Sequence, residues 1–327
     1  MLRPLGHRTG FHTLDRWLYN VGVVLRPPRD TDLVLGVDLD GFMWARRRAL
    51  PFVASLKGII ADELQNERGR VRALLGVQAR WERRNVERAD LVMVTSRYSA
   101  GVAQREYGVA PERLAVVPEP IDLEVWDDQF WRAPRRARTG PVVLCVARMY
   151  PRKRLHDLLR ATAILRARVP GIQVRIVGRG PEWVALGRLH AELGLTDSVV
   201  LLGDLPRERL AEEYVNATAF CLPSVQEGFG IVFLEAMAAE LPVVACRIAA
   251  VPEVVQDGVT GVLVAPRDPG ALAEGLERLI AEPARAKGLG QEGRRRALAF
   301  SPRHVAERFL SAVHSAHDRP GQRARGG

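Results

Sequence analysis

The residues from Phe220 to Cys246 constrain the fold of this 327-residue chain more than any other stretch. An apolar run ends at Pro223, a glycine-containing loop follows, and a second apolar run with helical spacing begins at Ile231. Residues 242–246 are β-branched and apolar, which indicates another buried strand. Strand, loop, helix and strand in this order form a crossover between parallel strands. The stretch therefore predicts a parallel α/β sheet.

Two carboxylates flank the beginning of the predicted helix. Glu227 lies in the loop just before it, and Glu235 follows after seven intervening residues. A helix N-terminus attracts phosphate, and glycines such as Gly228 and Gly230 allow backbone N–H groups to approach a ligand closely. Carboxylates on either side of a diphosphate can accept hydrogen bonds from sugar hydroxyls. The competing interpretation is a pair of solvated glutamates on a surface helix.

The segment PSVQEGFGIVFLEAMAAELPVVA resembles the donor-binding signature of the retaining family 4 (group 1) glycosyltransferases. The resemblance extends from about Thr31 to about His314. It implies the GT-B fold, in which two Rossmann-like parallel-sheet domains face each other across a cleft. It also implies transfer of a sugar, with retention, from a nucleotide-diphosphate sugar to a hydroxyl acceptor. On the same grounds, Glu227, Glu235 and the Gly228–Phe229–Gly230 loop bind the donor.

A second basic motif follows the predicted strand VVLCVAR. Arg148 ends that strand, and Lys153 comes five residues later, where the carboxyl ends of parallel strands bind ligands. The pair resembles the Arg-x4-Lys pair of the family, which implies stabilisation of the departing diphosphate. Only three of the 48 basic residues are lysines, and Lys153 is one of them. The alternative is a solvated basic loop, because Arg152 and Arg154 are its neighbours.

Three further positions are weaker candidates. Gly178 and Gly180, in VGRGP, permit the backbone to approach a nucleotide. Lys57 stands in SLKG, where many members of the family carry a histidine before a glycine. The resemblance implies that Lys57 contacts the diphosphate or the acceptor; an exposed lysine at a strand end is an equally open interpretation.

Asp38, Asp40 and Gly41 spell the DxD metal-binding signature of the other large glycosyltransferase fold. They follow an apolar run at a predicted turn, where Asp and Gly are common because they form local hydrogen bonds. We interpret them as a turn. Arg148, Lys153 and a helix N-terminus already offset diphosphate charge. We therefore expect no metal and no cofactor besides the donor substrate.

The alternation of strands and helices predicts two α/β domains. Residues 71–88 form a predicted helix with Leu74, Leu75, Val77 and Trp81 on its apolar side. Residues 14–25 are either one helix or a poorly ordered arm. The predicted parts are an acceptor-side domain (1–126), a linker (127–140), a nucleotide-sugar domain (141–300), a helix crossing back to the first domain (301–316) and a disordered tail (317–327).

The first domain is expected to be shortened at its start. Residues 1–30 contain no convincing strand, glycine-rich loop and long helix of the kind that opens the first domain of the family. This leaves a second class of function open, in which the chain is a non-catalytic scaffold or partner subunit that binds nucleotide-sugar without turnover. A glycan phosphorylase with pyridoxal phosphate is not favoured, because neither Lys153 nor Lys287 is suitably placed for a Schiff base.

Composition limits the partners and the compartment. The net charge of +10 is divided about equally between the first 140 residues and the rest, which argues against a nucleic-acid domain with one basic face. Attraction of the chain, or of its acceptor, to an anionic membrane surface stays open. No apolar run approaches the ~20 residues of a membrane span, and no signal peptide is expected. Cys145, Cys221 and Cys246 fall in predicted buried strands and indicate reduced thiols in a cytoplasmic protein.

Overall fold

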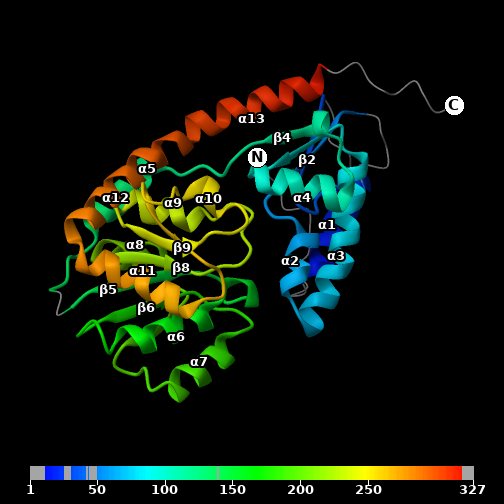
Figure 1. Cartoon of the computed structure of the whole chain (residues 1–327). Helices are drawn as coiled ribbons and strands as arrows, with labels where there is room; N and C mark the ends of the chain where they lie inside the picture. The colour runs from blue at the N-terminus through cyan, green and yellow to red at the C-terminus, as the bar shows by residue number, and fades with distance from the viewer. Residues whose placement is uncertain (1–11, 26–30, 42, 44–49, 138–139, 319–327) are drawn as a thin grey trace. The chain divides into compact units, whose positions relative to one another are not determined.

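The structure is a computed structural model that describes residues 12–25, 31–41, 43, 50–137 and 140–318. The chain divides into two compact units (Figure 1). In the described parts, unit 1 comprises the residues up to Pro118 together with those from Ala306 onward, and unit 2 comprises Glu119–Val305. Each unit is built around its own parallel sheet, so the predicted class of two Rossmann-like α/β domains is confirmed.

Unit 1 contains a four-stranded parallel sheet whose strands are neighbours in the order of the chain. The strands are β1 (Val34–Val37), β2 (Phe52–Leu56), β3 (Leu91–Val94) and β4 (Leu114–Val116). They alternate with α2 (Ile60–Glu63), α3 (Gly69–Arg88) and α4 (Arg97–Tyr107). Buried apolar side chains of β2 and β3 pack with Val86 of α3 and Val102 of α4 to form the core of this unit.

Two helices of unit 1 bear on the expectations from the sequence. Residues 14–25, for which a helix and a poorly ordered arm were both open, lie in helix α1 (His12–Leu25). The helix predicted at residues 71–88 is α3, which begins two residues earlier, and its apolar side is not buried throughout: Leu74 and Val77 are exposed. Its buried residues are Glu82, Asn85 and Val86, because only the C-terminal half of the helix packs against the sheet.

Unit 2 contains a six-stranded parallel sheet in the order β10-β9-β8-β5-β6-β7. The strands are β5 (Val142–Val146), β6 (Gln173–Val177), β7 (Val199–Gly203), β8 (Ala219–Leu222), β9 (Val243–Cys246) and β10 (Gly261–Val264). Strands β5 to β7 extend the sheet in one direction, and β8 to β10 extend it in the other. The winding therefore reverses between β5 and β8, which makes this pair the topological switch point.

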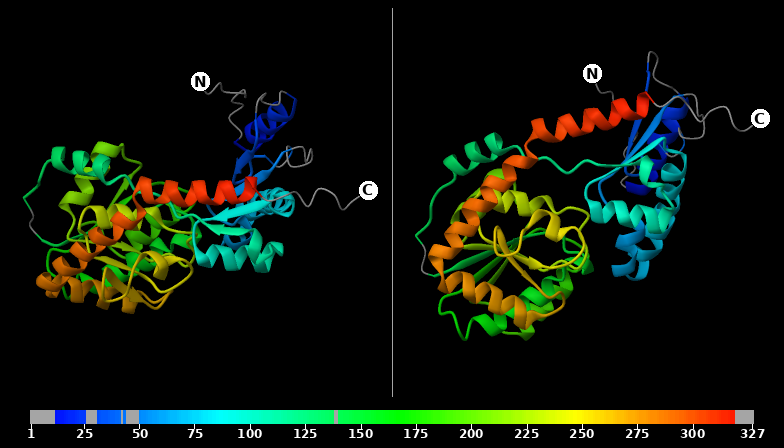
Figure 2. Two further views of the ribbon diagram at one scale, coloured as in Figure 1. Left: turned by 90° about the horizontal axis from the view of Figure 1, so that it is seen from above. Right: turned by 45° about the horizontal axis from the view of Figure 1, so that its top comes forward.

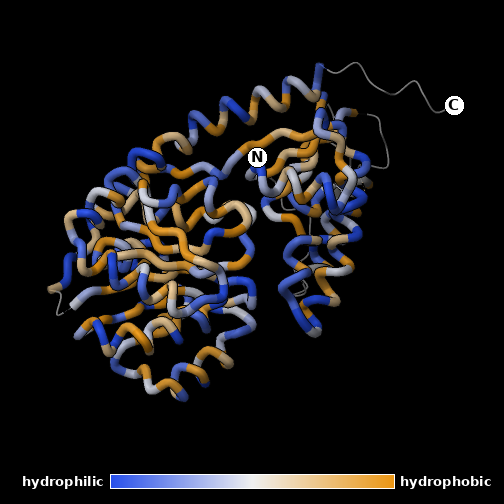
Figure 3. The backbone as a smooth tube through the Cα atoms, in the orientation of Figure 1, coloured by the Kyte–Doolittle hydropathy of each residue, from blue (hydrophilic) through white to orange (hydrophobic). Residues whose placement is uncertain are grey.

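Helices cover both faces of the sheet of unit 2 (Figure 2). Helix α6 (Leu155–Leu165) packs against α7 (Trp183–Glu192) and α11 (Pro269–Ala281) on one face. On the other face, α9 (Ile231–Ala238) packs against α12 (Pro283–Ala297), which the sequence analysis did not anticipate. The remaining helices are α8 (Arg207–Asn216) and α10 (Val251–Val254). Figure 3 shows hydrophobic residues concentrated along the strands of each unit, as expected for sheets buried on both faces.

The predicted linker at 127–140 begins inside a helix, so this boundary is corrected. Helix α5 (Leu123–Arg132) belongs to unit 2, which begins at Glu119. Its Trp126 and Phe130 rings lie 5.6 and 6.3 Å, centroid to centroid, from the ring of Tyr214 in α8. These aromatic contacts anchor α5 in the core of unit 2, whereas a run of arginines after it had suggested an open connection.

The last described element is helix α13 (Pro302–His317), and the division assigns its residues from Ala306 to unit 1. That it crosses back to the first domain stays a prediction. The predicted tail falls outside the described residues from 319 onward.

Cys145, Cys221 and Cys246 are buried free thiols in β5, β8 and β9. Burial raises the pKa of each thiol, that of Cys246 to about 12. In the described part of the chain, no helix combines the length and hydrophobicity that membrane crossing requires.

Candidate functional site

The candidate donor site of unit 2 lies at the switch point of its sheet. Strand β5 leads into the one-turn 3-10 helix Pro151–Lys153, and the neighbouring β8 leads into the loop that carries Glu227. Because carboxyl ends of parallel strands meet at one edge, the two loops are brought together. The backbone N–H of Val225 donates to the carbonyl of Arg152 at 2.8 Å, which fixes one loop against the other.

Lys153 and Glu227 form a buried ion pair. The Lys153 Nζ atom lies 2.6 Å from Oε1 of Glu227, and the side chains are 14% and 8% exposed. The Ser224 hydroxyl donates to the same oxygen at 2.7 Å. A buried charge needs such partners, because its desolvation is costly. The sequence placed Lys153 on a diphosphate and Glu227 on a sugar, and the structure holds the two groups against each other; Ser224 was missed, although it lies in the same motif.

The other basic residues of this loop behave differently from Lys153. The Arg152 guanidinium lies 4.8 Å from the ring centroid of Tyr150, and Arg154 makes a two-point contact with the carboxylate of Asp157 at 2.7 and 3.1 Å. Arg148 is exposed, and its side chain has no hydrogen bond or ion pair with the described residues. Lys153 is thus the cation that the loop directs to Glu227, and Arg148 is available to an anion.

The loop before α9 contains the predicted glycines and one residue with a different role. Gly230 precedes the helix with φ +90°, and a Cβ there would meet the Phe233 ring at 2.6 Å, so a glycine is required. Gly228 is half-buried in the loop. Phe229, predicted to bind the donor, is 5% exposed and packs edge-on against Phe300 at 5.5 Å. Its ring therefore supports the loop from the core.

Glu235 lies one turn inside α9, as the spacing predicts. The Tyr214 hydroxyl donates to its Oε2 at 2.8 Å. Burial raises the pKa of Glu235, although the hydrogen bond from Tyr214 and the charge of Arg207 act in the opposite direction. Tyr214 was not identified from the sequence, because it comes from α8 and nothing in its own segment marks it.

The glycines at 178 and 180 have a structural explanation. A Cβ at Gly178 would lie 2.1 Å from the carbonyl oxygen of Ala147, and one at Gly180 would lie 2.7 Å from the backbone of Met149. Both therefore permit close packing against the segment that leads to Lys153. The approach of a nucleotide to these glycines stays a prediction.

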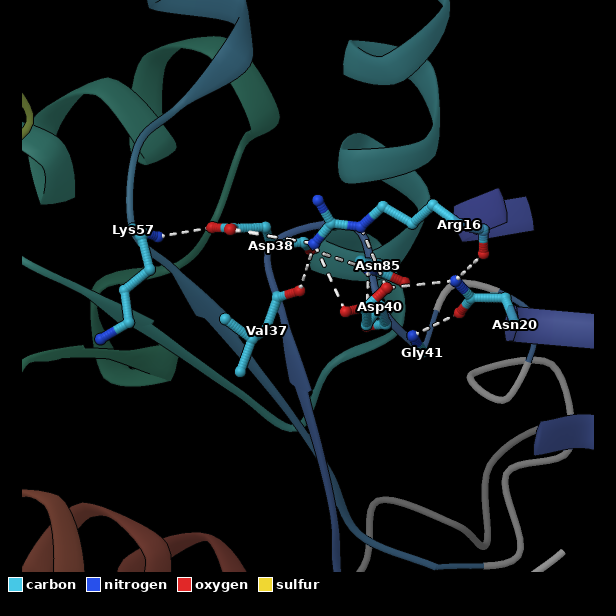
Figure 4. Close-up of polar contacts among 8 residues, drawn as sticks. All are labelled: Arg16, Asn20, Val37, Asp38, Asp40, Gly41, Lys57 and Asn85. Carbon is cyan, nitrogen blue, oxygen red and sulfur yellow. Dashed lines mark hydrogen bonds and ion pairs between the residues drawn. The ribbon is translucent and has the colours of Figure 1, made fainter. Parts of the chain in front are cut away.

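Unit 1 brings Lys57 next to the DxD turn (Figure 4). The Lys57 backbone N–H donates to Oδ1 of Asp38 at 2.8 Å, while the side chain is exposed and points away from the turn. Asp40 instead accepts hydrogen bonds from Arg16 and Asn20. The two carboxylates are thus engaged by different partners. Among the described residues, no group of three or more His, Cys, Asp or Glu side chains is arranged to hold a metal ion.

Two parallel Rossmann-like sheets, with a charged loop site at the switch point of the second, define the GT-B class of proteins. Residues 127–296 match the family described as Glycosyl transferases group 1, and residues 11–125 match Glycosyltransferase Family 4. The chain therefore belongs to the glycosyl transferases group 1 family. This is the family that the segment around Glu227 and Glu235 resembles.

Curated relatives share about a third of their aligned residues with this chain. The GDP-mannose-dependent alpha-(1-6)-phosphatidylinositol monomannoside mannosyltransferase of Mycolicibacterium smegmatis is 37% identical over 222 residues, which cover 64% of this chain and 58% of that protein. The D-inositol 3-phosphate glycosyltransferase of Nocardia farcinica is 34% identical over 248 residues, covering 72% of this chain and 54% of that protein. The chain thus spans a little over half the length of these relatives.

Solved structures agree on the fold. Sucrose-phosphate synthase from Thermosynechococcus elongatus superimposes with a TM-score of 0.76 at 24% identity, covering 94% of this chain and 79% of that one. HepE of Anabaena, in complex with UDP and glucose, gives a TM-score of 0.74 at 21% identity and covers 96% and 84%.

Proposed function

We propose that this chain is a glycosyltransferase that moves a sugar from a nucleotide-diphosphate sugar to a hydroxyl acceptor. The observation that carries the proposal is the buried Lys153–Glu227 pair at the switch point of unit 2. Ligands of doubly wound sheets bind at this position. A largely buried charge pair at this position is arranged to meet a polar ligand, because a purely structural pair would gain little from burial.

Each residue of the site has a role in this proposal. The Lys153 ammonium stabilises negative charge on the departing diphosphate, together with the exposed guanidinium of Arg148. Glu227, held by Ser224 and Lys153, accepts hydrogen bonds from hydroxyls of the transferred sugar. Glu235 accepts hydrogen bonds from the ribose, with its orientation fixed by Tyr214.

The proposed reaction proceeds with retention and without a metal or other cofactor. When the departing phosphate and the incoming hydroxyl share one face of the sugar, the phosphate itself accepts the proton of the acceptor. No protein nucleophile is then needed. Lys153 and Arg148 supply the positive charge that a divalent cation would otherwise provide.

The acceptor is proposed to be a hydroxyl compound of a glycan, a glycolipid or a small metabolite, bound by unit 1. The relatives are named for a phosphatidylinositol monomannoside and for D-inositol 3-phosphate, which favours a polyol and keeps a membrane-bound acceptor within the proposal. The net charge of +10 would favour approach to an anionic membrane surface from the cytoplasm.

A thermal-shift panel of nucleoside diphosphates and their sugars tests this proposal, because a ligand that binds the native state raises the melting temperature by mass action. We expect one nucleotide class to give a shift that Lys153→Ala abolishes. Hydrolysis or transfer of that nucleotide-sugar in the presence of EDTA then tests turnover without metal. A shift without turnover would favour the non-catalytic scaffold, and no shift with any nucleotide would contradict donor binding.

A further inference from the structure

The turn at residues 38–41 follows β1 at the carboxyl edge of the sheet of unit 1 (Figure 4). Asp38 adopts φ +52°, in the left-handed region, and Gly41 adopts φ +94°. The Asp40 N–H donates back to the carbonyl of Val37 at 3.0 Å. The turn places the Asp38 side chain beside Lys57, at the start of the loop that follows β2. Two neighbouring strands thus present polar groups at the edge where α/β proteins bind ligands.

Three side chains from two helices hold this turn in place. Asn85 of α3 donates to the carbonyls of Asp38 and Asp40 at 3.1 and 3.3 Å. Asn20 of α1 accepts the N–H of Gly41 at 2.7 Å, and Arg16 contacts the Asp40 carboxylate at 3.0 Å. Asn20 is 2% exposed and Asn85 is fully buried. We call Arg16, Asn20 and Asn85 the clamp. Turns of this length form without such support, so we infer that the clamp fixes the orientation of the side chains in the turn as well as its backbone.

The clamp is held at a cost to unit 1. The Oδ1 atom of Asn85 is buried at the turn without a hydrogen-bond partner among the described residues. Oε1 of Glu82, one turn earlier on the same helix, is also buried without a hydrogen-bond partner among the described residues. Buried polar atoms without partners destabilise the folded state. The folded state therefore tolerates this destabilisation at Asn85, the residue that orients the turn.

Asp38 and Asp40 differ in what their carboxylates do. Both oxygens of Asp40 accept hydrogen bonds from Arg16, at 3.0 and 3.4 Å. Asp38 uses Oδ1 for the N–H of Lys57, whereas its Oδ2 is 3.9 Å from Arg16, beyond hydrogen-bond distance. The Asp38 side chain is 33% exposed. One carboxylate oxygen is therefore oriented and open to a donor from outside the protein.

The surrounding charges indicate what kind of donor this is. Arg16 and Lys57 both act electrostatically on Asp38. Asp40 acts on it as well, so two cations face two carboxylates and the turn offers no net negative charge to a further cation. A neutral hydroxyl fits this environment, because it donates a hydrogen bond without adding charge.

We propose that Asp38 binds the acceptor, with Oδ2 accepting a hydrogen bond from a hydroxyl of a sugar or a cyclic polyol. Asn85, Asn20 and Arg16 are positioning residues that hold the turn so that this oxygen stays at the strand edge. The inference rests on the proposed function, since it assigns one residue of the acceptor site. It gives the DxD residues a role that requires no metal.

The variant Asp38→Asn isolates the proposed contact. Asparagine tolerates the left-handed conformation, and its amide oxygen still accepts the N–H of Lys57. In asparagine an NH2 group, which only donates, replaces Oδ2. The hydroxyl of the bound sugar or polyol therefore loses the oxygen to which it donates, while the turn is retained. Binding is measured by calorimetry with D-inositol 3-phosphate, mannose and myo-inositol as probes, and nucleotide binding is measured in parallel.

We expect the wild-type chain to bind at least one probe, Asp38→Asn to weaken it tenfold or more, and the nucleotide affinity of unit 2 to stay within twofold. Unchanged probe affinity in Asp38→Asn overturns the proposal, as does a wild-type chain that binds the nucleotide but none of the probes. Probe binding that requires manganese overturns it as well. A wild-type chain that binds no nucleotide instead contradicts the donor site, which is a separate failure.

Asp40→Asn changes the other carboxylate of the same turn. It weakens the contact through which Arg16 positions the turn, so we expect a lower melting temperature and a loss of probe affinity smaller than that of Asp38→Asn. Asn85→Ala tests positioning: it should weaken the probe at least threefold while nucleotide affinity stays constant. A lower melting temperature with unchanged probe affinity in Asn85→Ala would make Asn85 structural only and remove the clamp from the proposal.

Discussion

Both units place a lysine beside a carboxylate at the carboxyl edge of their sheets, yet the two pairs are built differently. In unit 2 the ammonium of Lys153 contacts Glu227 directly at 2.6 Å; Glu227 is buried and Lys153 is largely buried. In unit 1 the backbone N–H of Lys57 contacts Asp38, and the Lys57 side chain is exposed. The first arrangement creates a fixed, largely buried charge pair, and the second orients a carboxylate at the surface. The difference predicts that the pair of unit 2 matters far more to stability and turnover.

The largest effect is expected when Glu227 is removed. Glu227→Ala leaves the Lys153 ammonium buried without its partner, and breaking a buried pair in this way costs about 3–5 kcal/mol. Urea unfolding of unit 2 should show this loss, and sugar transfer should fall because the sugar loses its hydrogen-bond acceptor. Glu192→Ala, an exposed glutamate at the end of α7, is the control and should change the unfolding free energy by less than about 0.5 kcal/mol. Equal stability of the two variants would show that the pair is weakly held.

Lys153→Arg keeps the positive charge and changes its shape. The Lys153 side chain is 14% exposed, and its compact ammonium contacts Glu227, which Ser224 also contacts. The planar guanidinium is wider. If Lys153 contacts the leaving group, losing that contact should cost about 2.7–4 kcal/mol, or roughly a hundredfold to a thousandfold in the rate of transfer or donor hydrolysis.

Arg152→Lys is the control for Lys153→Arg, because this neighbour packs on Tyr150 and should tolerate the change within about threefold. Unchanged turnover in Lys153→Arg would remove Lys153 from the site. The Lys153–Glu227 pair of unit 2 would then matter no more to the rate of transfer than the Lys57–Asp38 arrangement of unit 1.

Glu235→Ala should weaken nucleotide-sugar binding more than it lowers turnover, because Glu235 is proposed to contact the ribose. The loss of one hydrogen bond to a charged group corresponds to about 1.5–3 kcal/mol, or at least a tenfold rise in the dissociation constant. Tyr214→Phe removes the hydroxyl that orients Glu235 and should give a smaller effect in the same direction. Calorimetry with the nucleotide identified in the thermal-shift panel decides this, and equal, negligible effects in Glu227→Ala and Glu235→Ala would remove both residues from the donor site.

The sequence was sufficient to predict the strands and the loops that carry the site. The strands of unit 2 are buried on both faces, so their β-branched apolar runs stand out, and polar residues after such runs must lie at one edge. Lys153 and Glu227 were found in this way. Their direct contact was not predicted, because it depends on β5 and β8 being neighbours in the sheet, an order that neither segment encodes by itself.

Other failures have equally local reasons. The apolar stripe of α3 indicated an amphipathic helix, but a stripe does not reveal which half of a helix packs, and the buried half contains Glu82 and Asn85. The second half of α5, from residue 127, was interpreted as linker because Pro134 and several arginines follow it, although Leu123, Trp126 and Phe130 of this helix are buried. The clamp on Asp38 was missed because Arg16, Asn20 and Asn85 come from distant segments.

The buried Glu82 makes the stability of unit 1 depend on pH. Burial raises its pKa from 4.5 to about 8, against the opposing hydrogen bonds from Tyr107 and the Ile60 N–H. The folded state therefore holds a proton that the unfolded state releases above its lower pKa. The contribution is fully present below about pH 4.5 and is lost as the pH rises to about 8, with a slope of up to about 1.4 kcal/mol per pH unit.

Glu82→Gln removes this titration and provides the comparison. The difference in unfolding free energy between wild type and Glu82→Gln should shift in favour of the variant between pH 5 and pH 8 and become constant above that. Hydrogen exchange of α3 and β3, measured across this range, reports unit 1 separately from unit 2. A difference that does not change with pH would show that Glu82 is ionised in the folded protein.

The smallest effect concerns the strained residue that each site contains. Asp38 in unit 1 and Ala249 in unit 2 both adopt positive φ, +52° and +51°. Asp stabilises this conformation with its side chain, whereas Ala has only the steric penalty of about 1–2 kcal/mol. Glycine has no such penalty but loses about 0.5–1 kcal/mol in backbone entropy on folding. Ala249→Gly should therefore stabilise unit 2 by about 0.5 kcal/mol, and Asp38→Gly should destabilise unit 1, because the Lys57 N–H loses its acceptor.

Ala249→Gly is also expected to affect the loop that carries Glu227. The N–H of the next residue, Ala250, donates to the backbone carbonyl of Glu227 at 3.3 Å, so relaxing Ala249 acts on the loop that holds the charge pair. If strain at Ala249 positions that loop, Ala249→Gly should gain stability in urea unfolding and lose a small part of its transfer rate. A gain in stability with an unchanged rate would show that the loop is held by Ser224, Lys153 and Val225 alone. The position of the Lys153–Glu227 pair would then not depend on the positive φ of Ala249, whereas in unit 1 the residue with positive φ, Asp38, itself makes the contact with Lys57.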